Sequence, residues 1–286
     1  PAEPTAVPTE VPTPEPTVPV YETCGTPEKP CVITFVPSAE VGKITVAGQG
    51  IADWLATETG LSFQIEVGTS FAASIEAMGA KKAQIGFLNT FSVLLADAKY
   101  GIDPALATVR KLAVNELSPD KDLKGTMQPY YRGQFITRAD SGIKSIADLK
   151  GKTFCFVDPN STSGYIIPNI MLKANGIDAE AGDVTATMAG SHPNVGVAVY
   201  KGDCDAGATY IDIRVDESAK LYETYPDIME AVVVFYTTDI IPNDGIQFIP
   251  NFDPELRAKI VAAFLKLAED EAGKQLLKDL YNINCL

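Results

Sequence analysis

Residues 153–174 read TFCFVDPNSTSGYIIPNIMLKA, an apolar run, a polar turn and a second apolar stretch in immediate succession. Residues 153–157 predict a buried β-strand, and residues 163–174 predict an α-helix that ends at the Asn-Gly pair 175–176. Pro168 lies one turn inside that helix, so the helix either begins later or bends there. A strand followed directly by a helix is the building unit of an α/β fold.

The same alternation extends in both directions from this stretch. Apolar runs that predict strands alternate with segments that predict helices, and the last helix opens at Asp253 with Pro254 as its first residue. This rhythm predicts a parallel or mixed sheet with helices on its faces. The strand candidates are residues 32–37, 61–67, 84–88, 131–138 and 153–157, and residues 184–236 continue the alternation.

The composition is that of a globular protein. The chain has 286 residues, of which 46% are hydrophobic and 21% charged, and this length suits two lobes of ordinary size. No apolar run approaches the roughly 20 residues that cross a bilayer. The formal net charge of −14 argues against a nucleic-acid partner, because phosphate backbones attract basic surfaces. A small anion is not excluded, because local backbone dipoles can hold it.

Residues 1–20 read PAEPTAVPTEVPTPEPTVPV and are rich in proline and threonine. Proline fixes φ and removes backbone donors, and the segment has too little apolar mass for a core. We expect residues 1–20 to make no tertiary contacts, and we take residues 1–30 as a disordered tether. A lipid or another anchor upstream of Pro1 is a hypothesis that would tether the folded part to a membrane. The alternative is a tail without function.

The cysteine and histidine content argues against a zinc site, and we expect no cofactor. No two cysteines have CxxC spacing, and the chain has a single histidine. Two separated pairs and one leftover thiol suit an oxidising compartment, although an inert buried thiol is the alternative for the cysteine inside the apolar run. The cysteines are Cys24, Cys31, Cys155, Cys204 and Cys285.

Three consecutive hydroxyl residues, Ser161, Thr162 and Ser163, precede Gly164 where the predicted helix begins. The first amides of a helix have no partner within the helix, and the helix dipole adds partial positive charge there. Together with the hydroxyl donors, they predict a site for a small anion that needs no lysine. The alternative is a helix cap alone, because serine and threonine are favoured caps.

Five segments of the chain occur in the order found in the phosphate/phosphite/phosphonate-binding components of ABC transporters. The chain resembles this family over residues 31–286, and the combination of segments is specific where each one alone is weak. The segments are FVPSAE (35–40), AQIGFLNTFSVLLA (83–96), IKSIADLKGKTFCFVDPNSTSGYIIPNIMLKANGI (143–177), SHPNVGVAVYKGDCDAGAT (191–209) and IIPNDGIQF (240–248).

The resemblance implies a type II periplasmic-binding-protein fold, in which two crossover strands join two α/β lobes and the ligand lies in the cleft between them. It places lobe 1 at residues 31–132 and 243–286 and lobe 2 at residues 133–242. The implied protein is an extracytoplasmic binding component, not an enzyme. It closes on a phosphonate, phosphite or related oxyanion by a hinge motion and presents it to a membrane permease.

The resemblance also implies the ligand contacts. Residues 161–164 stand where the family holds the phosphonate oxygens with hydroxyls and amides, and His192 stands where a histidine contacts the anion. Asp212 and Asp244 occupy places where some relatives carry acids that meet an aminoalkyl group. A carboxylate would repel the phosphonate unless a cation or a shared proton intervened, so these acids suggest an amino-bearing ligand.

The first lobe departs from the family pattern. Phe71 and Phe87 stand where some aminophosphonate binders have tyrosines, which removes two hydroxyls and makes that wall apolar. This departure argues against a large aminophosphonate and leaves phosphite, methylphosphonate or another small ligand. Core packing is the alternative for both phenylalanines. Asn89, Thr90 and Tyr130 are further polar candidates from this lobe.

A disulfide between Cys155 and Cys204 is a further implication, because the family topology places their strands side by side in lobe 2. Cys24 and Cys31 form a second expected pair, and Cys285 is left over.

Two other classes of protein compete with this interpretation. A hydrolase would use Ser161, His192 and Asp212 as nucleophile, base and orienting acid. No GxSxG motif is present, and three adjacent hydroxyls are more typical of an anion site. An adhesion module on a stalk would leave the hydroxyl cluster unexplained. Within the binding class, a sulfonate or phosphate is the alternative ligand, and reversible binding without turnover separates binding from catalysis.

Overall fold

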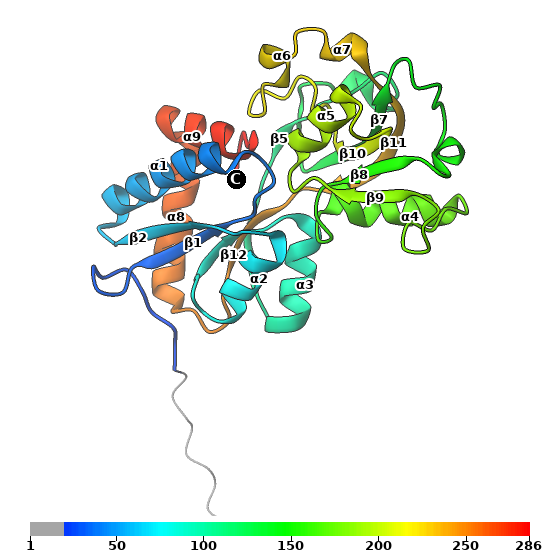
Figure 1. Cartoon of the computed structure of the whole chain (residues 1–286). Coiled ribbons are helices and arrows are strands. Elements are labelled where there is room, and N and C mark those ends of the chain that lie inside the picture. Colours follow the sequence, from blue (N-terminus) through cyan, green and yellow to red (C-terminus); the bar gives the residue numbers. More distant parts are fainter. Residues whose placement is uncertain (1–19) are drawn as a thin grey trace, which may run out of the picture.

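Residues 20–286 are described by the structure, a computed structural model, and they form two lobes that are each built on one main β-sheet (Figure 1). The expected two-lobed α/β fold is confirmed. Most of the predicted tether, residues 1–19, lies outside the described residues. Within residues 20–286, no helix combines the length and the apolar character needed to span a bilayer.

The sheet of lobe 1 has the strand order β2-β1-β3-β12-β4. Strand β1 pairs in parallel with β2 and β3, whereas β12 returns from late in the chain and pairs antiparallel with β3 and β4. The sequence pattern did not predict β4, an edge strand that contains Pro104. The elements of lobe 1 are β1 (Cys31–Phe35), α1 (Val41–Thr59), β2 (Phe63–Val67), α2 (Phe71–Gly79), β3 (Ile85–Phe87), α3 (Thr90–Tyr100), β4 (Asp103–Ala107), β12 (Gly245–Phe248), α8 (Pro254–Glu269) and α9 (Glu271–Tyr281).

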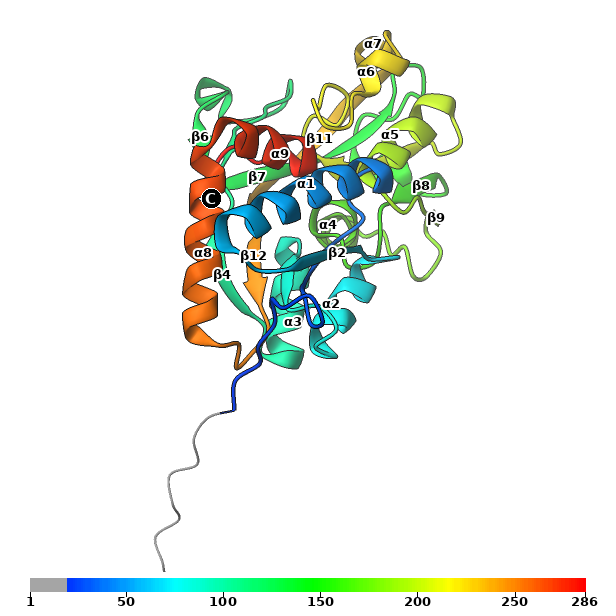
Figure 2. The same cartoon turned by 90° about the vertical axis from the view of Figure 1, so that its left-hand side faces the viewer.

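Helices cover both faces of this sheet. Helices α1, α8 and α9 pack on one another on one side, and α2 and α3 lie on the other (Figure 2). Phe87 is buried between Phe35 and Phe264, with ring centroids 4.9 and 5.9 Å away. Gly48 lets α1 approach the sheet closely, because a Cβ at that position would lie 2.8 Å from the ring of Phe35.

The sheet of lobe 2 has the order β11-β7-β10-β8-β9. Strand β8 pairs in parallel with β9 and β10, and β7 pairs antiparallel with β10 and β11. The elements of lobe 2 are β7 (Tyr130–Arg138), η2 (Ile146–Leu149), β8 (Thr153–Phe156), η3 (Thr162–Ile166), α4 (Ile167–Ala174), β9 (Thr185–Met188), α5 (His192–Lys201), β10 (Ala206–Tyr210), α6 (Leu221–Thr224), α7 (Ile228–Ala231) and β11 (Val232–Pro242). The segment that leads into this lobe holds β5 (Arg110–Lys111), η1 (Lys121–Leu123) and β6 (Met127–Gln128).

The burial of both faces of strand β8 explains why its sequence is apolar at consecutive positions. Successive side chains of a strand point to opposite faces. Phe154 and Phe156 join a buried cluster that includes Leu172 of α4, whereas Cys155 joins a second cluster that includes Val195 of α5. Both faces of the strand are covered, so neither can be polar.

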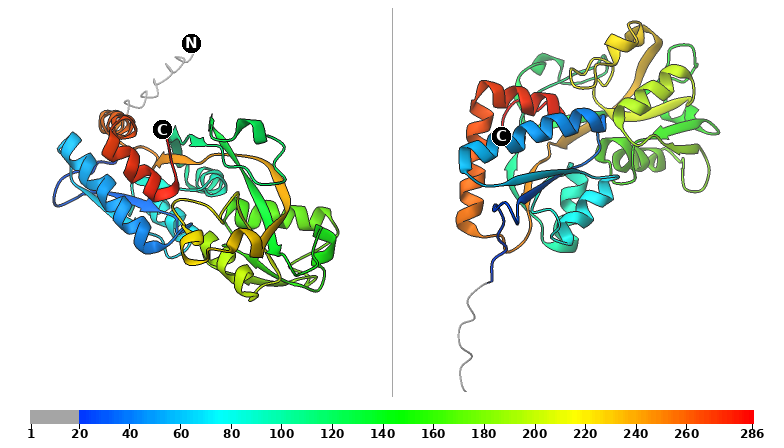
Figure 3. Two further views of the ribbon diagram at one scale, coloured as in Figure 1. Left: turned by 90° about the horizontal axis from the view of Figure 1, so that it is seen from above. Right: turned by 60° about the vertical axis from the view of Figure 1, so that its left-hand side comes forward.

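The chain crosses between the lobes at two adjacent places. Strands β7 and β11 are paired from Arg138 opposite Val232 to Tyr130 opposite Pro242. The pair Tyr130 and Pro242 lies next to the point where both connections leave lobe 1. There the amide of Asn243 donates to the carbonyl of Pro129 at 2.8 Å. Figure 3 shows the long gold strand β11 curving from lobe 2 toward lobe 1. Two neighbouring connections of this kind allow one lobe to rotate against the other.

The sequence suggested a tether that extends to residue 30, but the structure shows that it ends earlier. Glu22 is fixed to lobe 1 by its backbone, because its amide donates to the carbonyl of Asn251 at 2.7 Å and its carbonyl accepts from the amide of Asp253 at 3.0 Å. The carboxylate of Glu22 also pairs with Lys81 at 2.5 Å. Residues 21–30 therefore belong to lobe 1, and composition alone did not reveal these backbone pairings.

Both expected disulfides are confirmed. Cys155 of β8 is bonded to Cys204, just before β10, with the two Cα atoms 5.9 Å apart. Cys24 is bonded to Cys31 with a Cα separation of 4.9 Å. Cys285 is unpaired and partly exposed.

Removing the longer disulfide should destabilise the protein strongly. We expect the Cys155→Ser/Cys204→Ser variant to lose about 4 kcal/mol of unfolding free energy, the chain-entropy value for a bond that closes a sequence separation of 49 residues. Urea unfolding under oxidising conditions measures the loss. Cys285→Ser is the matched control and should unfold like the parent. Equal stability of the double variant and the parent would contradict this role for the bond.

Candidate functional site

A cavity of about 130 Å³ lies between the two lobes, and both lobes line it. Lobe 2 contributes three members of the hydroxyl turn, which we define as residues 161–164, together with His192. Lobe 1 contributes Phe71, Asn89 and Tyr281. Further lining residues are Arg110, Tyr130, Tyr131, Tyr210, Asp216 and Asp244.

The hydroxyl turn follows β8 and enters a single π-helical turn, η3, before α4 begins at Ile167. The helix therefore starts later than its sequence pattern suggested. Pro168 is the second residue of α4, directly after the π-helical turn, so the change from π-helix to α-helix occurs next to the proline. Gly164 is required by packing, because a Cβ there would come within 2.3 Å of Val157.

The start of η3 leaves backbone donors without partners. Ser161 caps the turn, and its Oγ accepts a hydrogen bond from the amide of Gly164 at 3.2 Å. The amides of Thr162 and Ser163 have no acceptor among residues 20–286. Both residues are buried and line the cavity. Unpaired amides at a helix start, next to hydroxyl groups, form the anion site that the sequence predicted.

Thr162 links the two lobes. Its Oγ1 accepts one hydrogen bond from Nδ2 of Asn89 and a second from the amide of Phe91, each at 2.9 Å. Nδ2 of Asn89 also donates to the carbonyl of Asn160 at 3.0 Å, which fixes the orientation of the Asn89 amide because a carbonyl can only accept. Asn89 therefore holds the hydroxyl turn against lobe 1.

His192 is a buried, neutral hydrogen-bond donor. Its Nδ1 accepts the amide hydrogen of Tyr210 at 3.1 Å, so the ring proton lies on Nε2. Nε2 is 3.3 Å from the Oγ of Ser161 and donates to it. Burial lowers the pKa of His192 to about 3, because the charged imidazolium would lose its hydration. The histidine thus reaches the hydroxyl turn without carrying a charge.

A second buried hydroxyl lies beside Ser163. The Oη of Tyr131 is 3.5 Å from the Oγ of Ser163. Burial raises the pKa of Tyr131 to about 12, so its phenol stays protonated and can donate. The sequence offered the neighbouring Tyr130 instead, whose Oη donates to Asp120 at 3.3 Å although the residue also lines the cavity.

Asp244 lines the cavity but is not a free carboxylate. Its Oδ1 is 2.8 Å from Nη2 of Arg110 and accepts from the hydroxyl of Thr108 at 2.7 Å. Arg110 also donates from Nε to the carbonyl of Tyr281 at 3.2 Å. The ion pair supplies the cation that an acid in an anion pocket requires. It also weakens the charge argument for an amine on the ligand, because such an amine would meet Arg110 too.

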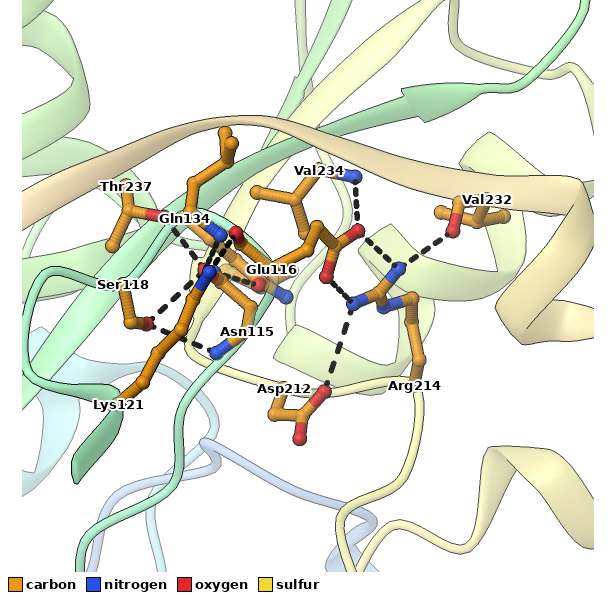
Figure 4. A network of polar contacts seen from close by, with 12 residues as sticks. Asn115, Glu116, Ser118, Lys121, Gln134, Asp212, Arg214, Val232, Val234 and Thr237 are labelled. Atoms are coloured by element: carbon orange, nitrogen blue, oxygen red, sulfur yellow. Dashed lines mark hydrogen bonds and ion pairs between the residues drawn. The ribbon is translucent and has the colours of Figure 1, made fainter. Parts of the chain in front are cut away.

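Asp212 does not line this cavity, contrary to the sequence-based expectation. It lies 3.8 Å from the buried Arg214, whose guanidinium also pairs with Glu116 at 2.8 Å (Figure 4). Burial raises the pKa of Asp212 to about 6. Asp212 cannot orient His192, because Nδ1 of that ring is occupied by the amide of Tyr210. The proposed hydrolase constellation therefore lacks its acid.

Two other predicted contacts lie outside the cavity. Phe87 belongs to the core of lobe 1 and lines no part of the cavity, so the core-packing alternative is correct for it. Thr90 is also absent from the lining, and its hydroxyl donates to the carbonyl of Pro242 at 2.7 Å. Phe71 and Asn89 do line the cavity, and Phe71 makes part of its wall apolar.

The lobes are in contact around the cavity. The amide of His192 donates to the carbonyl of Ser38 at 3.3 Å, and Nζ of Lys43 donates to the carbonyl of Ser218 at 3.0 Å. On another side, the amide of Phe71 donates to Asp158 at 3.4 Å. These hydrogen bonds join lobe 1 to lobe 2 on several sides, as in the closed state of a hinged binding protein.

Solved structures with high structural similarity share this architecture. The binding protein component of an ABC phosphonate transporter from Pseudomonas aeruginosa is 22% identical, with a TM-score of 0.73 over 88% of this chain and 80% of that chain. PhnD1 from Prochlorococcus marinus (MIT 9301), solved in complex with methylphosphonate, is 16% identical, with a TM-score of 0.71 over 89% of this chain and 90% of that one. This likeness shows that the two α/β lobes and the cavity between them have the type II periplasmic-binding-protein fold.

The chain belongs to the family described as "ABC transporter, phosphonate, periplasmic substrate-binding protein", which it matches over residues 33–285. This match confirms the resemblance seen in the five sequence segments. The phosphate-import protein PhnD of Mycolicibacterium smegmatis is 28% identical over 201 residues, which are 68% of this chain and 58% of that protein. The chain thus spans little more than half the length of this curated relative.

The buried neutral histidine should make stability depend on pH. Its folded-state pKa of about 3 lies below its usual value of 6.5, so the unfolded state binds more protons between these values. The contribution of the neutral histidine to the free energy of unfolding is complete above pH 6.5 and is lost as the pH falls toward 3. Between pH 7 and pH 5, the parent should lose about 2 kcal/mol more unfolding free energy than His192→Gln.

Urea unfolding of both proteins at pH 7 and pH 5 measures this difference, and the carboxyl titrations common to both cancel. An identical loss in parent and variant would mean that His192 can be protonated in the folded state.

Proposed function

We propose that this chain is the extracytoplasmic substrate-binding component of an ABC importer and that it captures a small phosphonate-like oxyanion between its lobes. The observation that carries the proposal is the hydroxyl turn, where buried hydroxyls and two unpaired amides meet at the cavity. Membership of the phosphonate-binding family supports the class of ligand. The methylphosphonate bound to the structural neighbour from Prochlorococcus marinus supports it further.

The cavity favours a small ligand. It encloses about 130 Å³, and Phe71 and Leu112 contribute apolar surface to it. The carboxylate of Asp244 is already paired with Arg110, so no unpaired charge there calls for an amine. We therefore favour phosphite or methylphosphonate over an aminoalkylphosphonate, with phosphate or a sulfonate as the alternative.

Hinge closure couples binding to delivery. Ligand oxygens at the hydroxyl turn satisfy donors of lobe 2, and the hydrogen bonds from Asn89 and Phe91 to Thr162 then hold lobe 1 against them. We infer that a membrane permease receives the closed form and that the chain works outside the cytoplasm, tethered to a membrane. The names of its relatives as periplasmic or import proteins support this location. No catalytic step is assigned, because within residues 20–286 Nδ1 of His192 is occupied by the amide of Tyr210 and not by an acid.

Calorimetric titration tests the proposal directly. Phosphite, methylphosphonate, phosphate, 2-aminoethylphosphonate and methanesulfonate are titrated into the purified protein. At least one of the three phosphorus oxyanions without an amine should bind tightly and be recovered unchanged. Failure of every compound to bind would contradict the proposed function.

Removing donors from the hydroxyl turn should weaken binding of the ligand so identified. We expect Thr162→Ala/Ser163→Ala to raise Kd by roughly two to four orders of magnitude. Each lost hydrogen bond to a charged group is worth about 1.5–3 kcal/mol, and about 1.4 kcal/mol corresponds to tenfold. Calorimetry of parent and variant measures the change.

The matched control is Thr185→Ala/Thr187→Ala, which removes two hydroxyls from the exposed strand β9 of the same lobe. It should bind like the parent. Unchanged affinity in the Thr162/Ser163 variant would reduce the hydroxyl turn to a helix cap.

A further inference from the structure

The hydroxyl of Ser161 can act only as a donor toward a ligand. Its Oγ already accepts two hydrogen bonds, from the amide of Gly164 at 3.2 Å and from Nε2 of His192 at 3.3 Å. The direction of the second bond is fixed, because Nδ1 of His192 is itself an acceptor for the amide of Tyr210. A hydroxyl has two acceptor positions and one hydrogen. Only the hydrogen remains, and within residues 20–286 it has no protein acceptor.

Thr162 is restricted in the same way by lobe 1. Its Oγ1 accepts from Nδ2 of Asn89 and from the amide of Phe91, and both are donors that cannot reverse their roles. The orientation of the Asn89 amide is fixed by the carbonyl of Asn160. The hydrogen of Thr162 is therefore the free position of this hydroxyl, and no acceptor for it exists in the described part of the chain.

The rest of the turn adds donors. The amides of Thr162 and Ser163 cannot accept, and they have no partner within the described range. Among the three side-chain oxygens of the turn, Oγ of Ser163 alone keeps an acceptor position within the described range, and the phenol of Tyr131 approaches it at 3.5 Å. Elsewhere in the cavity wall, Oδ1 of Asp244 accepts from Arg110 and Thr108, and Asp216 accepts from Ser218 at 2.5 Å, whereas Oδ2 of Asp244 has no donor within residues 20–286.

We propose that the hydroxyl turn selects an oxyanion group whose oxygens all lack protons, so that the dianion of a phosphonate or phosphite binds in preference to its monoanion. This inference rests on the proposed function and deepens it. A P–OH hydrogen directed at Ser161, Thr162 or the two amides would face donors, and the hydrogen bond lost there would weaken binding roughly tenfold to a hundredfold. The dianion presents only acceptors to the same groups.

The protein has its own titrating groups near the site, and the experiment must separate their titration from the titration of the ligand. His192 faces the turn from α5 and stays neutral, because its pKa is about 3. Asp212, whose pKa is raised to about 6, lies outside the cavity beside Arg214. The remaining ionisable groups that face the turn or line the cavity are Asp158, Arg110, Lys111, Tyr130, Tyr131, Tyr210, Asp216, Asp244 and Tyr281.

The experiment measures the Kd of the full chain by calorimetry from pH 5 to pH 9 with two ligands, methylphosphonate and fluoromethylphosphonate. Fluorine withdraws electrons and lowers the second pKa of the ligand with little change in size. If only the dianion binds, Kd rises about tenfold for each pH unit below the second pKa of the ligand and is flat above it. The break should move with the pKa of the ligand. Asp212→Asn, which removes the titrating carboxyl outside the cavity, should give the same profile as the parent.

The possible outcomes are distinct. A break that follows the ligand pKa in parent and Asp212→Asn supports the inference. A flat profile through the ligand pKa overturns it while leaving the proposed function intact, as does a break at the same pH for both ligands. Binding of neither ligand at any pH overturns the inference as well. If the other phosphorus oxyanions of the titration panel also fail to bind, the proposed function falls with it.

Discussion

Two buried amides, those of Thr162 and Ser163, have no partner within residues 20–286 and impose the constraint on which the site depends. A buried donor left unpaired costs about 1–3 kcal/mol, so a closed cleft around these groups is poorly stable unless something accepts from them. The start of η3 cannot supply an acceptor, because Gly164 and Tyr165 already use the side chain and carbonyl of Ser161. A ligand with several acceptor oxygens removes the cost for both amides at once. Closure without a ligand would have to leave both donors buried and unpaired.

The same constraint explains why Thr162 carries the link between the lobes. The donors that reach it from lobe 1, Asn89 and Phe91, stand at the start of α3, where backbone amides again lack helical partners. Two helix starts, α3 and η3, thus meet at one hydroxyl oxygen. An anion that accepts the hydrogen of Thr162 leaves both lone pairs of Oγ1 directed at lobe 1. Ligand binding and lobe contact therefore reinforce each other through one atom.

Local patterns in the sequence predicted most strands and helices and singled out the hydroxyl turn, whereas the two-lobed arrangement was implied by the family resemblance. The apolar run of β8 and the hydroxyls after it follow from adjacent residues, and so does the place of Pro168 near the start of α4. The surroundings of the cavity depend on distant segments and left no local signal. Arg110, Tyr131 and Tyr281 reach the cavity from the connecting segment, from β7 and from the end of α9. Asp212 is not among the residues that line the cavity and lies 3.8 Å from Arg214 instead, and no spacing rule predicts that.

The charge distribution shows how an acidic protein can bind an anion. The chain carries a formal net charge of −14, yet the carboxylate of Asp244 in the cavity wall is matched by Arg110. The histidine at the turn is neutral, since burial lowers its pKa to about 3. The charged side chains that line the cavity, Arg110, Lys111, Asp216 and Asp244, balance in sign, so we infer that the proposed attraction for an anion comes mainly from oriented dipoles, namely hydroxyls, amides and the helix start, which act over short distances. Such a site selects by the number and position of acceptor oxygens more than by total charge, and the long-range field of the acidic surface has little influence on that selection.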